Sequence, residues 1–195
     1  MRARLRFLPA LGTVVGVAVL LKIVYAPWFL NYDARYALLW ARDLARGLTP
    51  DYEAPFAPTP HPLETLVSLV AVPFGTGGDA IMLWATLLAF GALVWLAYRL
   101  GAELFTPAVG VVTALVVLTR PALERDALLG YQDTAFAVLI VWAVLLEARH
   151  QFDKVARAEA VIELMHEDAF PGVAAGARRS RQREQIEWLE PSLGR

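Results

Sequence analysis

Residues 81–98, IMLWATLLAFGALVWLAY, contain no charged side chain, and the nearest charges on either side are Asp79 and Arg99. A helix needs about 17–25 mainly apolar residues to cross the hydrocarbon core of a bilayer. This stretch is therefore predicted to be a membrane-spanning helix, and it identifies the chain as an integral membrane protein.

Further apolar segments lie on both sides of this stretch and extend the prediction to about four spans. The spans are expected near residues 7–29, 80–99, 103–121 and 132–148, with an outer loop at 30–78. The first segment could instead be a signal peptide, because Arg2, Arg4 and Arg6 precede its apolar core. Its length and the lack of a small-residue cleavage site favour an uncleaved anchor.

Charged residues are rare in the chain and unevenly placed. Of its 195 residues, 57% are hydrophobic and 19% are charged, and residues 149–195 hold 16 of the 37 charges. We therefore expect an all-α membrane module over residues 1–148 and a soluble tail over 149–195. The net charge of −1 does not favour nucleic acid as a partner, and without cysteine there is no disulfide or thiolate site.

The basic residues predict the orientation of a multi-pass protein in the cell membrane. Arginines at the N-terminus favour the cytoplasmic side, and four spans return the tail to that side. Residues 65–74 form a short apolar run that Pro73 and Gly75 close. We expect a helix lying on the outer surface there; if it crossed the membrane, everything after it would invert.

The outer loop is predicted to hold a second surface helix and a proline-rich segment. Residues 34–46 contain strong helix formers and an apolar stripe, which suits a helix in the membrane interface. That stripe comprises Tyr36, Ala37, Trp40, Ala41 and Leu44. Residues 50–62 contain five prolines, so this segment is expected to be a stiff, extended cover.

Two aspartates border the outer side of this membrane module. Asp33 follows the first predicted span and Asp133 precedes the last, so both could face one cavity. A carboxylate there could act as a general base on a hydroxyl group. Alternatively, each aspartate could simply cap the helix that it precedes.

Other polar residues of the outer loop have competing interpretations. His61 lies between two prolines in the loop, where the sequence alone favours a solvated side chain over a ligand or an acid. Asp51 and Glu53 have D-x-D-like spacing, but their proline-rich setting favours a solvated pair. No metal site or cofactor is assigned, and a divalent cation stays an open question.

The order of these features resembles the N-terminal part of the GT-C glycosyltransferases, especially the aminoarabinose–lipid A transferases and protein O-mannosyltransferases. Residues 32–36, YDARY, are similar to the family's Asp-Glu-x-Arg-Tyr, with Ala34 in place of glutamate. Residues 59–63, TPHPL, look like its Lys/His-Pro-Pro-Leu element. Residues 123–133 resemble its Arg-x-x-x-x-Asp segment, although Arg125 lies further from Asp133.

The resemblance implies transfer of a sugar from a polyprenyl-phosphate-linked donor at the outer membrane face. It implies Asp33 as the catalytic base and Asp133 as a second acidic site residue. It also assigns substrate binding to Arg35, Tyr36, His61 and Arg125.

The chain is short for this family, and we expect a shortened gene product. The alternative is a non-catalytic remnant, or a subunit of a larger membrane complex. A transporter fragment is disfavoured, because no predicted span has an ionisable residue at its centre.

Overall fold

The computed structural model describes residues 2–25 and 29–169, and every regular element in that part of the chain is helical. This confirms the all-α prediction. The chain divides into two units, Met1–Leu146 and Glu147–Arg195, and each is considered by itself. Residues 170–195 of the predicted soluble tail lie outside the described residues.

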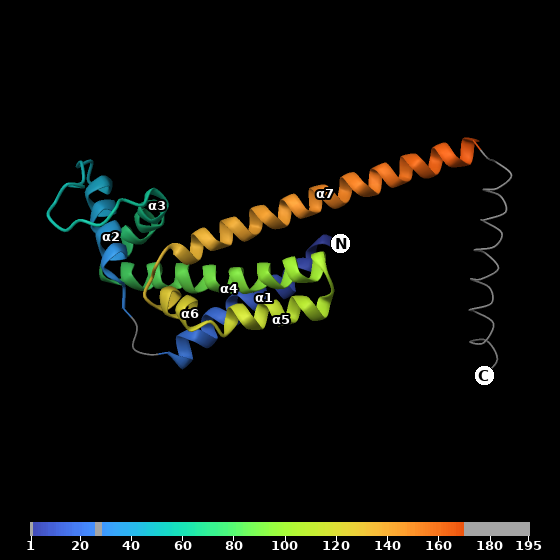
Figure 1. The fold of residues 1–195 in the computed structure, drawn as a ribbon. Helices are drawn as coiled ribbons and strands as arrows, with labels where there is room; N and C mark the ends of the chain where they lie inside the picture. Colours follow the sequence, from blue (N-terminus) through green and yellow to red (C-terminus); the bar gives the residue numbers. More distant parts are fainter. Residues whose placement is uncertain (1, 26–28, 170–195) are drawn as a thin grey trace. The chain divides into compact units, whose positions relative to one another are not determined.

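Helix α4, Gly78–Leu104, contains the opening stretch and forms the centre of the first unit (Figure 1). One face of α4 packs against α1, Arg2–Val24, in a core of large apolar side chains. The buried members of this core are Val17, Ala18, Leu21, Leu87, Phe90, Val94 and Ala127. The most apolar segment of the sequence thus supplies the main packing surface of the unit.

Glycine allows the helix backbones to approach closely at two places along α4. A Cβ atom added at Gly91 would lie 2.3 Å from the carbonyl oxygen of Val14 in α1. On another face, Gly101 meets Gly110 of α5, Pro107–Leu118, where an added Cβ would lie 3.0 Å from Gly110 Cα. Small residues at helix contacts are typical of packing inside membranes, where backbone proximity replaces the hydrophobic effect.

Two helical stretches are long and apolar enough to cross a membrane, Pro62–Leu104 and Asp133–Glu159. Helices α5 and α6, Pro121–Leu128, would together form a third span, bent by 59° at their junction. The apolar part of α1, Leu8–Val24, is shorter. Two or three candidate spans are therefore present in the described residues, and the fourth stays a prediction.

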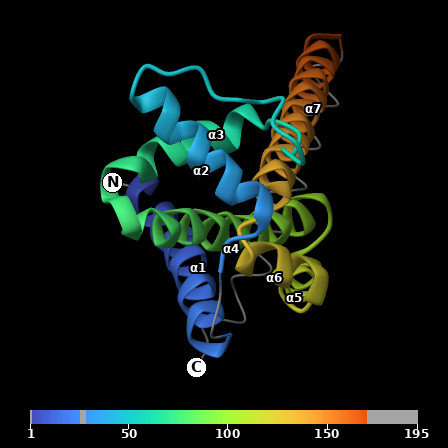
Figure 2. The ribbon, with the colours of Figure 1, turned by 90° about the vertical axis from the view of Figure 1, so that its left-hand side faces the viewer.

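The helical stretch that begins at Pro62 changes direction before α4. Helix α3, Pro62–Ala71, leads into a 3-10 segment η1, Val72–Gly77, where Gly75 adopts a non-helical φ of 56°. Helix α2, Tyr32–Ala45, packs on α3 (Figure 2), and a cluster including Leu38, Ala71 and Met82 joins α2, α3 and α4. We treat α4 as the membrane-crossing part of this stretch and α2 with α3 as a helix pair at its Gly78 end.

The buried face of α2 matches the predicted stripe only in part. Ala37, Trp40 and Ala41 are buried as expected, but Leu44 is 40% exposed and Leu38 is buried in the α2–α3 contact. Tyr36 is half-buried. The error arose because the sequence alone does not show on which side of α2 its partner helix lies.

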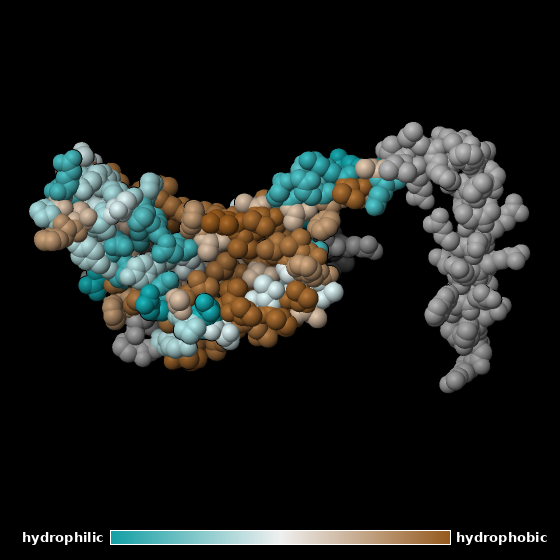
Figure 3. Space-filling view, viewed as in Figure 1, coloured by the Kyte–Doolittle hydropathy of each residue, from teal (hydrophilic) through white to brown (hydrophobic). Residues whose placement is uncertain are grey.

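Figure 3 shows hydrophobic surface over the length of α4 and α5 and hydrophilic surface at the end that holds α2 and the outer loop. Such a distribution is compatible with a membrane protein, because apolar side chains face lipid and polar ones face water or headgroups. The last helix among the described residues, α7, Asp133–Ala169, runs without a break past residue 148. The predicted boundary between membrane module and tail is therefore not a break in secondary structure.

Candidate functional site

A small acidic cavity lies in the first unit where the starts of α2, α3 and α7 meet. Its volume is about 30 Å³, enough for roughly two water-sized groups. Seven residues line it: Asn31, Asp33, His61, Glu64, Tyr131, Gln132 and Asp133. The structure therefore brings Asp33, His61 and Asp133 to one place, although their chemical roles stay predictions.

Backbone contacts hold the two aspartate-bearing segments together. The Asn31 N–H donates a hydrogen bond of 2.7 Å to the Leu129 carbonyl oxygen, which joins the start of α2 to the turn before α7. Gly130 in that turn has a φ of 79°, and a Cβ there would lie 2.8 Å from Leu30 Cδ2. Glycine is favoured at this position both by the left-handed backbone and by the close neighbour.

Asn31, and not Asp33, caps helix α2. The Asn31 side-chain oxygen accepts a hydrogen bond of 2.8 Å from the Ala34 N–H, and the backbone of Asn31 is extended as an N-cap requires. Asp33 lies two residues after the cap, within the first turn of α2, and is half-buried at the cavity. The interpretation of Asp33 as a simple cap is therefore wrong, and its carboxylate is available to the cavity.

Asp133 is the first residue of α7 and lines the same cavity from the opposite segment. Both carboxylates thus lie in the first turns of helices, where the positive end of the helix dipole favours a negative charge. Two carboxylates at one small cavity can accept a proton from a hydroxyl group and orient it. They can do so without help from a metal ion or an organic cofactor.

Glu64 is a third acid of the cavity, and sequence reasoning missed it. Its side chain is only 5% exposed, and it shares the inner face of α3 with Ser68 and Ala71. Burial, reinforced by the negative charges of Asp33 and Asp133, raises the pKa of Glu64 from 4.5 to about 7. The available signal was an acidic residue in register with small residues at positions i+4 and i+7.

The raised pKa of Glu64 predicts a pH-dependent stability. The unfolded chain releases this proton near pH 4.5 and the folded chain near pH 7, so stability falls as the pH rises between these values. Glu64→Gln removes this loss and should stabilise the protein by about 2 kcal/mol above pH 7, after allowance for solvent screening. Thermal melts in detergent at pH 5 and pH 8 measure the effect.

The control for this prediction is Glu53→Gln, because Glu53 is exposed in the proline-rich loop. That variant should melt like the parent protein at both pH values. A Glu64→Gln protein whose melting temperature follows the parent at both pH values would contradict the prediction.

Three predicted substrate-binding residues lie away from the cavity lining. Arg35 is exposed on α2. The ring of Tyr36 contacts the ring of Tyr32, with centroids 4.8 Å apart. Arg125 is 70% exposed at its side chain and forms an ion pair of 3.2 Å with Asp126. Only His61 of the four predicted binding residues lines the cavity.

The proline-rich loop is attached to α2 by two side chains. The Tyr32 hydroxyl donates to the Phe56 carbonyl oxygen at 2.6 Å, and Trp40 Nε1 donates to the Asp51 carbonyl oxygen at 3.3 Å. The Asp51 carboxylate accepts from the Glu53 N–H at 3.1 Å, which is a local turn interaction. Nowhere among the described residues do three His, Asp or Glu side chains have a placement suited to a metal ion.

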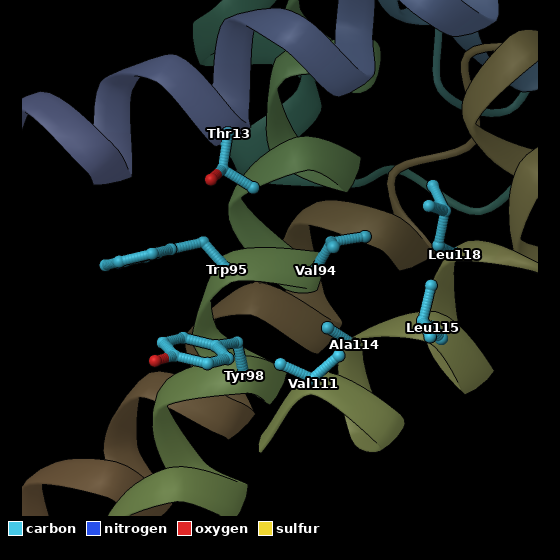
Figure 4. A pocket seen from close by; sticks show the side chains of 8 residues that line it. All are labelled: Thr13, Val94, Trp95, Tyr98, Val111, Ala114, Leu115 and Leu118. Carbon is cyan, nitrogen blue, oxygen red and sulfur yellow. The ribbon is translucent and has the colours of Figure 1, made fainter. Parts of the chain in front are cut away.

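A second, larger cavity of about 260 Å³ lies among α1, α4 and α5 (Figure 4). Its lining is almost entirely apolar: Thr13, Val94, Trp95, Tyr98, Val111, Ala114, Leu115 and Leu118. The Thr13 hydroxyl donates to the Pro9 carbonyl oxygen within its own helix. No carboxylate or basic group lines this cavity, so it offers no acid–base chemistry.

Comparison with known proteins adds no further constraint. No family model, no curated protein and no solved structure matches this chain. Any function assigned to the chain is therefore supported by the geometry of the acidic cavity and by the order of its sequence motifs.

Proposed function

We propose that this protein transfers a sugar from a polyprenyl-phosphate-linked donor to an acceptor hydroxyl at the outer face of the membrane. The observation that carries the proposal is the meeting of Asp33 and Asp133 at one cavity, although 100 residues separate them in the sequence. Residues at the starts of α2 and α3 line the cavity, and these two helices lie at the end of the unit where the surface changes from apolar to polar (Figure 3).

In the proposed reaction, Asp33 accepts the proton of the acceptor hydroxyl. The acceptor oxygen then forms a bond to the anomeric carbon of the sugar, while the bond from that carbon to the phosphate oxygen breaks. The polyprenyl phosphate leaves with the electron pair of that bond. Asp133, at the same cavity, orients the acceptor through a hydrogen bond and disfavours entry of the phosphate.

The donor phosphate would therefore bind outside the acidic cavity. Arg35 is exposed on α2 outside the cavity lining, and a guanidinium group binds phosphate through paired hydrogen bonds. The polyprenyl chain of the donor would remain in the apolar part of the bilayer. The phosphate of the donor and the hydroxyl group of the acceptor would thus bind at different places.

A transfer assay on the full chain tests this proposal. The purified protein in lipid vesicles is incubated with a radiolabelled polyprenyl-phosphate sugar and a neutral glycoside acceptor. We expect labelled acceptor and free polyprenyl phosphate to accumulate in equal amounts. Absence of both products across a panel of sugar donors would contradict the proposal.

A second candidate function is that of a non-catalytic subunit in a larger membrane complex. The observation in its favour is α7, because only 6% of its apolar window is buried by the rest of the chain. Purification from native membranes distinguishes the two functions. A subunit would co-purify in fixed stoichiometry with one polytopic protein and would show no turnover alone.

A further inference from the structure

Two buried polar atoms at the acidic cavity have no hydrogen-bond partner among the described residues. They are Nδ2 of Asn31 and Oε1 of Glu64, in side chains that are 8% and 5% exposed. An unsatisfied buried polar group costs about 1–3 kcal/mol, so such atoms are normally satisfied by an ordered water or by a ligand. The Asn31 atom is a donor, the Glu64 oxygen is an acceptor when its carboxyl group is ionised, and both residues line the cavity.

The orientation of the Asn31 amide is fixed by the helix that it caps. Its oxygen accepts the hydrogen bond from the Ala34 N–H, so a flipped amide would lose that bond and place two N–H groups against each other. The unpartnered atom of Asn31 is therefore an N–H donor. The cavity therefore presents an N–H donor beside its three carboxyl groups, so it can select for a ligand group that accepts a hydrogen bond.

The two unpartnered atoms require a ligand group that both accepts and donates a hydrogen bond. A hydroxyl group does both, whereas an ammonium group only donates and cannot accept from Asn31. A phosphate or carboxylate group accepts but is repelled by Asp33, Glu64 and Asp133. The cavity volume of about 30 Å³ also fits a hydroxyl with its carbon better than a larger anion.

We propose that Asn31 and Glu64 together bind one hydroxyl group of the acceptor, between the Asn31 amide and the Glu64 carboxyl group. Asp33 and Asp133 line the same cavity, so the bound hydroxyl lies beside the proposed base. This inference rests on the proposed transfer reaction and names its acceptor class, a neutral hydroxyl-bearing molecule. Glu64 and Asn31 are binding residues in this reaction, and the transferred proton goes to Asp33.

Ligand-observed NMR on the full chain in detergent micelles tests the binding directly. The probes are methyl β-D-glucopyranoside and its uronate analogue. We expect saturable binding of the neutral glycoside, with a Kd in the millimolar range, and at least fivefold weaker binding of the uronate, which the carboxylates of the cavity repel. No saturable binding, meaning that the cavity takes water only, would overturn the inference.

Two pairs of variants assign the binding to these atoms. Asn31→Asp keeps the oxygen that caps α2 but removes the N–H donor, and Glu64→Leu removes the acceptor, so both should lose the neutral glycoside. Glu64→Gln keeps an acceptor oxygen and should retain binding, as should the loop control Glu53→Gln. Unchanged binding by both Asn31→Asp and Glu64→Leu would also overturn the inference.

The transfer assay separates failure of this inference from failure of the proposed function. If both hold, Asn31→Asp should raise the KM for the acceptor about tenfold, with little change in the KM for the donor. If the variant transfers sugar with an unchanged KM for the acceptor, then Asn31 does not bind the acceptor, but the proposed transferase function stands. If the protein shows no turnover but binds the glycoside, and these variants abolish that binding, then the hydroxyl site stands and the transferase function is wrong.

Discussion

Asp33→Asn should lower the kcat of sugar transfer by about 10²–10⁴-fold, the usual contribution of a general base. Asparagine has nearly the same shape as aspartate, but its amide does not accept a proton from the acceptor hydroxyl. The KM for the acceptor should change much less, because Asn31 and Glu64 remain in place to bind it. Steady-state transfer rates with saturating donor measure both constants.

The structure predicts that this variant folds normally. Asn31 supplies the cap of α2, so the loss of charge at position 33 leaves the hydrogen bond to Ala34 intact. Asp51→Asn is the matched control, since Asp51 is exposed in the proline-rich loop and away from the cavity. Full transfer activity in Asp33→Asn would end the catalytic role assigned to this residue.

Gly91→Ala should destabilise the protein by about 3 kcal/mol, the upper part of the range for overpacked cores. The added methyl group would lie 2.3 Å from the Val14 carbonyl oxygen and 2.9 Å from Val14 Cα. These are backbone atoms of α1, so relief requires the whole helix to move away from α4. A thermal melt in detergent should show the midpoint lowered by roughly 6–12 °C.

Gly16→Ala on α1 is the control for this prediction. Nothing lies within 4 Å of a Cβ added at Gly16, so the substitution meets no obstacle. Alanine also favours a helix over glycine by about 1 kcal/mol, and this variant should be as stable as the parent or slightly more so. Equal melting temperatures for the Gly91 and Gly16 variants would show that the α1–α4 contact is not close.

The sequence predicts α4 well because its apolar run is uninterrupted and flanked by charges. It also places Asp33 and Asp133 near each other, because each borders an apolar segment on the same predicted side of the membrane. The surface helix expected at residues 65–74 corresponds to α3 and η1, with its start moved to Pro62. Each of these predictions came from a pattern within one segment of sequence, and such local patterns determine secondary structure directly.

Contacts between segments were harder to predict. The spacing of Glu64 from Ser68 and Ala71 was a weak signal, because the burial of Glu64 depends on where α3 meets the starts of α2 and α7. The bend of 59° between α5 and α6 interrupts the span expected at 103–121, at the residues before Pro121. Arg125 looked like a binding residue in its motif, yet it pairs with its neighbour Asp126. The burial of Glu64 depends on tertiary placement, whereas the bend and the ion pair are local features, and hydropathy encodes none of the three.

The hydrogen bond from the Asn31 N–H to the Leu129 carbonyl oxygen has a consequence for biosynthesis. Asp33 leaves the ribosome about 100 residues before Asp133. The cavity residues at the start of α2 are therefore synthesised before those at the start of α7. Until Leu129 and Gly130 have emerged, the start of α2 lacks its backbone partner. Assembly of the cavity therefore requires that the segment before α7 has emerged and has reached the start of α2.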